Sequence, residues 1–347
     1  MYDFETPPSL GSINYTGSIR HCPEDFRVTE VISFSPSGSG DHIYLYVKKR
    51  ECNTDWVAQQ LAKVAGLKLV DVGYAGKKDR HAVTRQWFSL HMPNQPEPDW
   101  ENALPDEINI LEKTRHEKKL KSGAIKENQF CIVVREIEGD MADIERRLLC
   151  LKDQGMPNYF GQQRFGNNNG NVRKLIEMVK HRRRVKRTQR GIYISAGRSF
   201  LFNQILKQRI LQKNWNQAID GDVMMLDGSK AIFVAEADDE QLVPRVNEMD
   251  IHPASMLWGR GERLAKADAA IIEAQVLEAN SELLDALDQS GSQLSYRALR
   301  VNLSLLEWQS ENNSLTLNFS LPTGAYATSL LNEVVNTSGF QNAESVD

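Results

Sequence analysis

The sequence predicts a mixed α+β fold built on a discontinuous domain, and three observations lead to this prediction. The 347 residues are 41% hydrophobic and 25% charged, which is an ordinary globular balance. At about 150 residues per domain, this length favours two domains that each bury a core. Segments rich in β-forming residues lie toward both ends of the chain and flank a middle of different composition. We therefore expect one domain to be interrupted by an insertion.

The first third of the chain carries mostly strand signals. Residues 26–34 and 42–47 are rich in β-forming side chains, and the turn residues 36–40 join them, which predicts a hairpin. A helix over 54–64 follows. Further strands are predicted at 67–72, 83–90 and 130–135.

The character of the chain changes near residues 153–157. Residues 158–210 are first rich in Gly and Asn and then strongly basic, and residues 236–250 are acidic. Helices are predicted at 143–151, 199–211, 265–284 and 328–335. Strands are predicted at 221–234, 303–306 and 315–321.

The charge of the chain is unevenly distributed. The formal net charge is −4, yet residues 173–209 hold twelve Lys and Arg against the single acid Glu177, a local charge of +11. This basic segment predicts a surface for a polyanion on an otherwise acidic body. The alternative is a solvated helix face.

Several classes of protein are excluded by what the sequence lacks. No apolar run approaches the ~18 residues that a membrane span needs. The four cysteines form no C-x-x-C pair, and His116-Glu117 lacks the second histidine of H-E-x-x-H. No nucleophile elbow or cofactor-binding glycine loop occurs. We expect a reduced cytoplasmic protein that uses no metal, no cofactor and no membrane.

A carboxylate surrounded by cations stands out at residues 73–80. The segment differs from a phosphate-binding P-loop, since only two residues separate its glycines and Lys78 stands where Ser or Thr is needed. Nearby cations favour an ionised Asp79, which nucleophilic or base chemistry requires. Lys77, Lys78 and Arg80 can also meet phosphates. The alternative is an aspartate paired with its neighbours on an exposed turn.

Two further clusters suit a nucleic acid. Residues 158–166 alternate aromatics and amides with Arg164 and glycines, which can stack on bases or bond their edges. A tight interdomain turn with core aromatics is the alternative, and both roles are compatible. Asn128 and Phe130 follow a lysine-rich stretch at 118–121 and share a strand face, so they can form a base pocket. Alternatively, Phe130 lies in the core and Asn128 begins the strand.

Together these motifs resemble a known family. Residues 73–86 read G-Y-A-G-K-K-D-R-x-A-x-T-x-Q and residues 158–166 read N-Y-F-G-x-Q-R-F-G, which resemble the two signature motifs of the TruD family of tRNA pseudouridine synthases. Residues 23–26 and 324–328 also resemble that family. The resemblance spans almost the whole chain in the family's order.

The resemblance implies an activity and a domain organisation. It implies isomerisation of uridine to pseudouridine in tRNA, at position 13 in bacterial members, without cofactor or metal. It implies an α+β catalytic domain around a mixed, mainly antiparallel sheet, over residues 1–153 and 301–347, with an inserted α/β domain over 154–300. We expect a monomer whose partner is tRNA. The alternative is a non-catalytic RNA-binding or RNA-remodelling protein on the same scaffold.

The resemblance also implies roles for single residues. The catalytic aspartate of the family corresponds to Asp79, and the route by which it acts stays open: attack at C1′, attack at C6 or removal of the C2′ proton. Contacts to the target nucleotide correspond to Phe26, Asn128 and Tyr326, the last commonly Phe in the family. Arg20 matches a basic partner of the aspartate, and Phe130 matches an aromatic pocket floor. The expected contacts to the RNA backbone are Lys77, Lys78, Arg80, Arg164, Arg182, Arg183 and Arg184.

Overall fold

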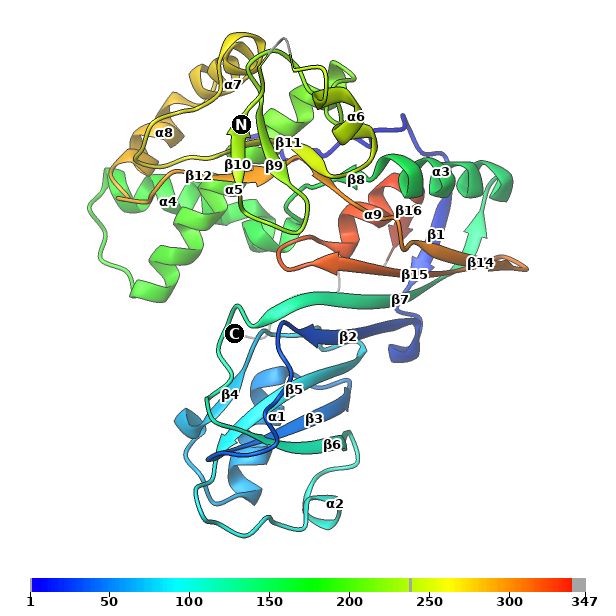
Figure 1. Cartoon of the computed structure of the whole chain (residues 1–347), viewed down its shortest axis with the longest axis vertical. Helices are drawn as coiled ribbons and strands as arrows, with labels where there is room; N and C mark the ends of the chain where they lie inside the picture. The colour runs from blue at the N-terminus through cyan, green and yellow to red at the C-terminus, as the bar shows by residue number, and fades with distance from the viewer. Residues whose placement is uncertain (1, 237–238, 339–347) are drawn as a thin grey trace. The chain divides into compact units, whose positions relative to one another are not determined.

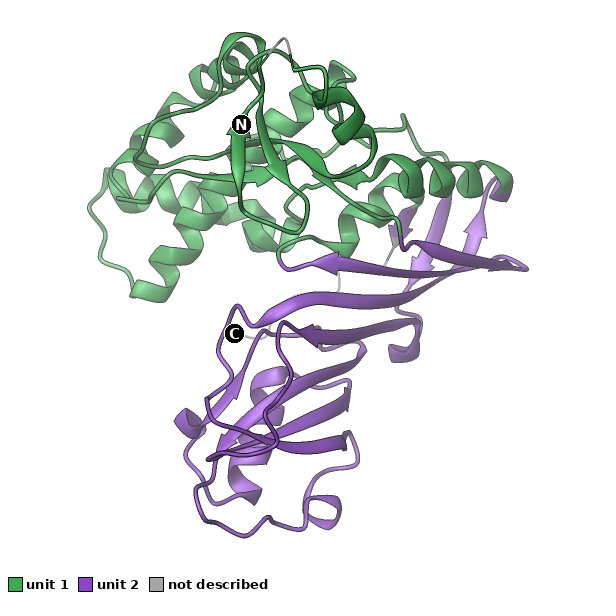
Figure 2. Ribbon diagram, in the orientation of Figure 1, with its two compact units in different colours: residues 1–14, 142–304, 324–335 green, residues 15–141, 305–323, 336–347 purple. Residues whose placement is uncertain are grey.

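The computed structural model describes residues 2–236 and 239–338, and the chain folds into two compact units (Figures 1 and 2). Unit 1 comprises residues 1–14, 142–304 and 324–335, and unit 2 comprises residues 15–141, 305–323 and 336–347. No helix in the described ranges combines the length and apolar character that crossing a membrane requires.

Unit 2 is built on a ten-stranded sheet (Figure 1). Its strands are β1 (Thr16–Ile19), β2 (Phe26–Ile32), β3 (His42–Arg50), β4 (Val72–Tyr74), β5 (Val83–His91), β6 (Ile108–His116), β7 (Ile125–Glu138), β14 (Glu307–Glu311), β15 (Ser314–Pro322) and β16 (Asn336–Ser338). The main order is β14-β15-β7-β2-β5-β3-β6. Only β2–β5 and β1–β16 pair in parallel among the described strands, which confirms a mixed, mainly antiparallel α+β fold.

The predicted hairpin is wrong, although both of its strands form. β5 lies between β2 and β3, parallel to β2 and antiparallel to β3. The connecting turn packs on the end of β6 instead, where Gly38 donates its N–H to the carbonyl of Arg115. A turn signal predicts that the chain bends, and it does not exclude a third strand from the space between the two arms.

One face of this sheet is covered by α1 (Thr54–Val64). Ile43, Leu45 and Val47 alternate along β3, and they are fully buried in one cluster with Val57 and Leu61 of the helix. The short helix α2 (Trp100–Ala103) lies before β6. Because α1 begins only four residues after β3 ends, its first turn is held close to that strand's last residues.

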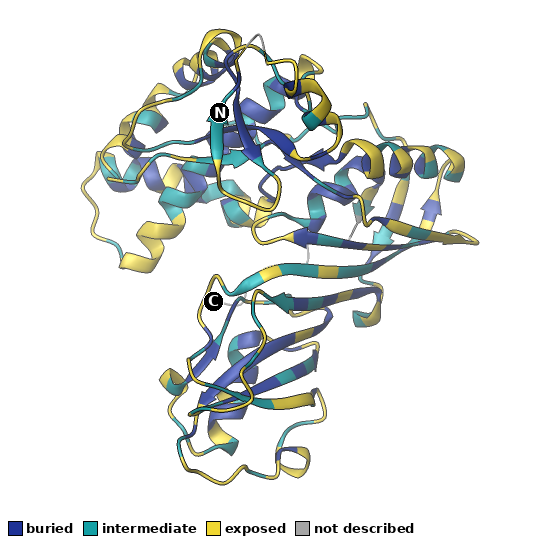
Figure 3. Ribbon diagram, in the orientation of Figure 1, coloured by how far each residue is buried: buried dark blue, intermediate teal, exposed yellow. Residues whose placement is uncertain are grey.

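Unit 1 combines helices with two small sheets (Figure 1). Its helices are α3 (Met141–Gln154, with only Met141 outside the unit), α4 (Gly170–Lys180), α5 (Arg187–Leu211), α6 (Leu242–Asn247), α7 (Ala267–Glu278), α8 (Ser281–Asp288) and α9 (Ala327–Val334). Its strands are β8 (Met156–Pro157), β9 (Val223–Leu226), β10 (Ile232–Val234), β11 (Ile251–Leu257), β12 (Ser295–Ala298) and β13 (Arg300–Val301). The buried residues of α5 lie between Ala196 and Ile210, and Phe200 and Phe202 among them belong to the core of the unit. Figure 3 shows how buried and exposed residues are distributed over the ribbon.

Three sequence predictions need correction, and the domain prediction stays open. Residues 303–306, predicted as a strand, form a turn in which Leu303 and Leu306 are buried. Residues 69–71 form a 3-10 turn, and the predicted helix over 265–284 breaks into α7 and α8. Residues 154–300 lie wholly in unit 1. The division into a catalytic domain and an insertion remains a prediction.

Candidate active site

Asp79 lies on the loop between β4 and β5, where it meets Arg20. The Nη2 atom of Arg20 is 3.5 Å from Oδ1 of Asp79, and the two side chains are 6% and 35% exposed. Arg20 follows β1 directly and has a φ of 60°, a left-handed conformation that is uncommon for a residue with a Cβ atom. The predicted partner of the aspartate is therefore beside it, on a constrained piece of backbone.

The same guanidinium group covers an aromatic ring. The Cζ atom of Arg20 is 4.3 Å from the ring centroid of Phe26, a cation–π contact. Burial lowers the pKa of Arg20, and the charge of Asp79 opposes that change. Phe26 is only 2% exposed, so its ring supports Arg20 and presents little surface to a base.

The backbone of the Asp79 loop is anchored at three positions. Nζ of Lys49 donates to the Asp79 carbonyl at 2.7 Å. The Thr54 hydroxyl accepts from the Lys78 N–H at 2.9 Å and donates to Gln86. The Gln86 side chain in turn donates to the Gly76 carbonyl at 3.1 Å. These bonds tie the loop to β3, β5 and the first turn of α1, and they fix where the carboxylate projects.

Lys78 does not lie where it was expected. Its Nζ is 2.5 Å from Oε2 of Glu30, both side chains are buried, and the other carboxylate oxygen of Glu30 accepts from the Trp87 N–H. Burial raises the pKa of Glu30, and Lys78 opposes that rise. In contrast to the prediction, Lys78 is thus not available to a phosphate. Its partner lies 48 residues away, so the local sequence does not reveal it.

The neighbouring cations remain at the surface. Lys77 is 70% exposed and pairs with Asp55 at 2.6 Å. Asp55 also accepts from the Tyr74 hydroxyl at 2.5 Å, and Arg80 is exposed. Lys77 and Arg80 therefore keep the exposure that a phosphate contact requires.

Strand pairing places a row of side chains on the face of the sheet that α1 also covers. Directly paired residues share a face, and the register aligns five residues across five strands. From β3 to β15 they are Lys49, Thr84, Val28, Phe130 and Phe319.

Asn128 and Phe130 lie on this face, as their spacing predicts. Phe130 stacks on Phe319, with ring centroids 5.2 Å apart and planes 12° apart, and meets Phe26 edge to face. Asn128 pairs with Glu30 of β2 one row further along. Within the described residues, Oδ1 of Asn128 and Oγ1 of Thr84 are buried without a hydrogen-bond partner. Such atoms are costly unless a ligand or water satisfies them.

Tyr326 belongs to unit 1 and precedes α9. Its hydroxyl accepts a hydrogen bond from Nη2 of Arg164 at 2.8 Å. Its ring centroid is 6.1 Å from that of Phe160. A Cβ atom at Gly161 would lie 3.0 Å from the Tyr326 ring, so glycine permits this close approach. Arg164 also donates to Ser195 at 3.2 Å. Arg164 therefore holds Tyr326, and its predicted contact with RNA backbone stays a prediction.

The second signature motif forms core in unit 1. Tyr159, Phe160 and Phe165 are buried in one cluster. The Asn203 side chain accepts from the N–H of Phe160 and donates to its carbonyl, each at 2.9 Å. These rings therefore fit the alternative interpretation of the segment, that its aromatics belong to the core, better than a surface that stacks on bases.

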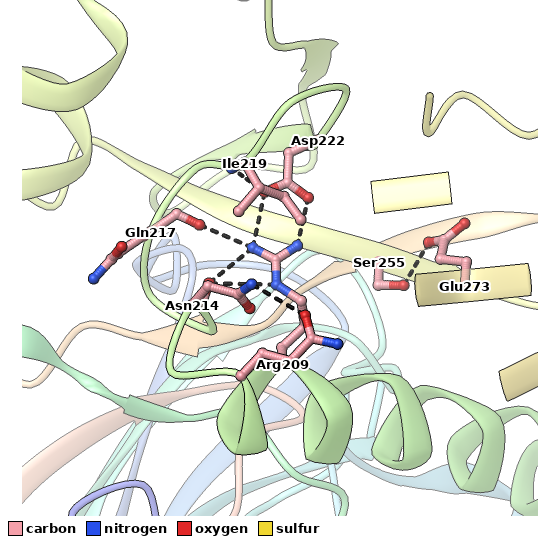
Figure 4. A network of polar contacts seen from close by, with 8 residues as sticks. Arg209, Asn214, Gln217, Ile219, Asp222, Ser255 and Glu273 are labelled. Atoms are coloured by element: carbon pink, nitrogen blue, oxygen red, sulfur yellow. Dashed lines mark hydrogen bonds and ion pairs between the residues drawn. The ribbon is translucent and has the colours of Figure 1, made fainter. Parts of the chain in front are cut away.

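The basic segment divides into exposed and buried cations. Arg182, Arg183 and Arg184 are exposed in the turn between α4 and α5. Arg209, in contrast, is buried in an ion pair with Asp222 at 2.7 Å (Figure 4). Arg198 and Lys207 are likewise engaged with carbonyls or acids of unit 1. Only part of the predicted polyanion surface is therefore accessible.

Figure 4 shows why Arg209 belongs to the framework of unit 1. Its guanidinium also donates to the carbonyls of Asn214 and Gln217, and Asp222 accepts from the N–H of Ile219. These contacts join the end of α5 to the loop that precedes β9. Arg209 is also only 2% exposed, so it is not accessible to a phosphate.

Sequence reasoning missed the residues that anchor the Asp79 loop. Lys49, Thr54 and Gln86 are the main ones, and Glu30 holds Lys78. A signal for Lys49 exists, because it continues the buried alternation of Ile43, Leu45 and Val47 along β3. No group of three or more His, Cys, Asp or Glu side chains in the described ranges could hold a metal ion. Independence from metals and cofactors stays a prediction.

Comparisons with known proteins agree on one family. The model of the family described as tRNA pseudouridine synthase D (TruD) matches residues 11–182 and 171–334. A tRNA pseudouridine synthase D from Methylococcus capsulatus is 42% identical over 333 residues, covering 95% of this chain and 94% of that protein. One from Nitrosococcus oceani is 44% identical over 326 residues, covering 93% and 91%.

A solved structure supports the fold. A crystal structure of TruD from Methanosarcina mazei has a TM-score of 0.73 at 19% identity, covering 97% of this chain and 96% of that one. At that identity the likeness concerns the fold alone. The family model and the two relatives extend over nearly all of the chain, and so the chain belongs to the TruD family of tRNA pseudouridine synthases.

Proposed function

We propose that this chain converts uridine 13 of tRNA to pseudouridine, with an ionised Asp79 as its catalytic residue. The curated relatives carry the name tRNA pseudouridine synthase D, which supports this isomerase activity and its tRNA substrate. The observation that carries the site is the ion pair between Arg20 and Asp79, whose loop is anchored to the sheet. A cytoplasmic, monomeric enzyme is part of the proposal.

The reaction exchanges one glycosidic bond for another. The bond between N1 and C1′ breaks, the base turns, and a bond between C5 and C1′ forms while the C5 proton is lost and N1 gains one. A carboxylate can begin this sequence at C1′, at C6 or by removing the C2′ proton. Each route needs an ionised acid, and the Arg20 guanidinium 3.5 Å away is a suitable counter-charge for it.

A base must leave its stack to reach Asp79, at a cost of a few kcal/mol. The half-buried ring of Phe130, stacked on Phe319, is a platform that could return ~1–3 kcal/mol per base. The buried amide of Asn128 lacks a partner at Oδ1, and this acceptor matches the N3–H donor of uracil. Tyr326 is proposed as a further nucleotide contact on its resemblance to the family motif.

Mapping pseudouridine in total tRNA by mass spectrometry tests this function. Cells that lack the protein should lose pseudouridine at position 13, and wild-type protein should restore it. A plasmid encoding Asp79→Asn, expressed to the same level, should not. Unchanged pseudouridine in the deletion strain contradicts the proposed activity. Restoration by Asp79→Asn would favour the alternative, in which this protein only binds or remodels the RNA and a different enzyme modifies it.

A further inference from the structure

We infer that Lys49 is a positioning residue for Asp79, whose buried ammonium group holds the backbone of the catalytic loop against the sheet. The inference rests on the proposed function of Asp79 and adds a residue outside both signature motifs. It begins from the location of Lys49 within β3.

Lys49 occupies a position that suits an apolar side chain. It is 0% exposed and continues the buried alternation of Ile43, Leu45 and Val47. Its register partners on the two neighbouring strands are Thr84 and Ile108, neither of which is charged. Burying an ammonium group costs free energy unless hydrogen bonds and charges compensate it. A lysine here therefore needs a reason that packing does not supply.

The contacts of Lys49 supply that reason. Nζ donates to the Asp79 carbonyl and to the Cys52 carbonyl, both at 2.7 Å. Cys52 lies between β3 and α1, and Asp79 lies between β4 and β5. One ammonium group thus joins two loops that are separate in sequence. Both acceptors are backbone carbonyls, so these bonds fix the chain path at Asp79 and leave its carboxylate free to react.

Three titratable groups act on Lys49 electrostatically. Burial lowers the pKa of Lys49 to about 8, while Cys52 and Asp79 oppose that change and Lys78 adds to it. Lys78 is itself paired with Glu30. Below pH 8 the ammonium group stands as a positive charge behind the Asp79 loop. Above that pH the group becomes a neutral amine, whose hydrogen bonds to the two carbonyls are weaker than those of the ammonium group, so the loop is held less firmly.

Activity and stability should respond in opposite ways. In the unfolded chain Lys49 keeps its proton up to about pH 10.5, whereas the folded protein releases it near pH 8. Between these values the unfolded state binds more protons, so the contribution of Lys49 to stability rises with pH. A rate that falls above pH 8 therefore cannot be explained by this group weakening the fold.

Single-turnover formation of pseudouridine tests the inference, with full-length protein in excess over a tRNA transcript from pH 6 to 10. Lys49→Met keeps the side-chain length and removes the donors, and displacement of the loop should slow the reaction roughly 100-fold. Affinity for tRNA should stay within about 3-fold. Lys48→Met is the matched control, because Lys48 lies on the opposite face of β3, and its rate should stay within about 2-fold.

Lys49→Arg provides a second readout, because arginine stays protonated throughout this range. Wild type should lose rate above pH 8, and Lys49→Arg should lose less. A wild-type rate for Lys49→Met overturns the inference. If Lys49→Met does not fold, an alkaline fall in Lys49→Arg equal to that of wild type overturns it. If neither variant folds, a wild-type rate that does not fall above pH 8 overturns it.

Asp79→Asn, measured in parallel, separates this inference from the proposed function. If Asp79→Asn is inactive and Lys49→Met is not slowed, only the role of Lys49 is wrong. If Asp79→Asn still forms pseudouridine, the assignment of Asp79 as the catalytic residue is wrong and the role of Lys49 falls with it.

Discussion

Nη2 of Arg20 lies 3.5 Å from Oδ1 of Asp79, while the same guanidinium group covers the ring of Phe26 at 4.3 Å. One buried cation therefore contacts both the proposed catalytic carboxylate and an aromatic side chain of the sheet. Phe26 in turn meets Phe130 edge to face. Charge and aromatic packing are coupled at this site, so substitutions of Arg20 can separate their contributions.

Replacing Arg20 should slow pseudouridine formation according to what the substitute retains. Arg20→Met removes the charge beside Asp79 and should reduce the single-turnover rate roughly 100-fold. Arg20→Lys keeps the charge but loses the planar group over Phe26, and a loss of about 10-fold is expected. Equal rates for the two variants would contradict a role for the charge.

The hydroxyl of Tyr326 should contribute to stability more than to the reaction. Tyr326→Phe keeps the ring but leaves Nη2 of Arg164 without the acceptor it has at 2.8 Å. We expect the free energy of unfolding in urea to fall by about 1 kcal/mol. The rate should stay within about 3-fold, whereas Tyr326→Ala should weaken tRNA binding through loss of ~1–3 kcal/mol of stacking. Equal binding by the two variants would contradict the stacking role.

The exposed arginines between α4 and α5 should contribute salt-dependent affinity. Replacing Arg182, Arg183 and Arg184 by Gln should weaken tRNA binding. It should also reduce the steepness of the slope of log K against log salt concentration by up to about 3. The matched control replaces three exposed lysines outside the basic segment, Lys63, Lys68 and Lys152. Filter binding between 50 and 300 mM salt measures both slopes, and an unchanged slope for the arginine variant contradicts the prediction.

A buried carboxyl group should make unit 1 less stable as the pH rises. Glu333 of α9 accepts from the N–H and hydroxyl of Ser9, and burial raises its pKa to about 7, opposed by Ser9 and Arg147. The folded state thus holds a proton that the unfolded chain releases near pH 4.5. The contribution of Glu333 to the free energy of unfolding is complete below pH 4.5. It is lost as the pH rises through 7, a change on the order of 3 kcal/mol.

Glu333→Gln removes this titration and isolates its effect. The difference in melting temperature, variant minus wild type, should increase between pH 5 and pH 8, because only wild type must ionise the buried acid. Thermal unfolding at a series of pH values measures it. A difference that does not change with pH would show that Glu333 does not titrate in this range.

Local periodicity predicted much of the framework of unit 2. The predicted helix over 54–64 and the strand over 83–90 correspond to α1 and β5. The shared face of Asn128 and Phe130 followed from the two-residue repeat of a strand. Neighbouring strands could not be predicted in the same way, because β5 enters between β2 and β3 from about 40 residues further along the chain.

The site was less predictable because burial depends on distant partners. Lys78 looked like a surface cation until Glu30, 48 residues away, was seen to neutralise it. The bond from Arg164 to the hydroxyl of Tyr326 could not be predicted either, because the two residues are 162 positions apart. Lys49 lies in the run Lys48-Lys49-Arg50, which resembles a solvated charge cluster. Only the two-residue repeat of β3, which places Lys49 on the buried face, distinguishes it from Lys48 and Arg50.

The most direct test of the proposed mechanism is the single-turnover yield of pseudouridine for Asp79→Asn on a tRNA transcript. Asparagine keeps the size of the side chain and removes the negative charge. The variant should form no detectable product while binding tRNA within a few-fold of wild type. Product at the wild-type rate would contradict the assignment of Asp79 as the catalytic group.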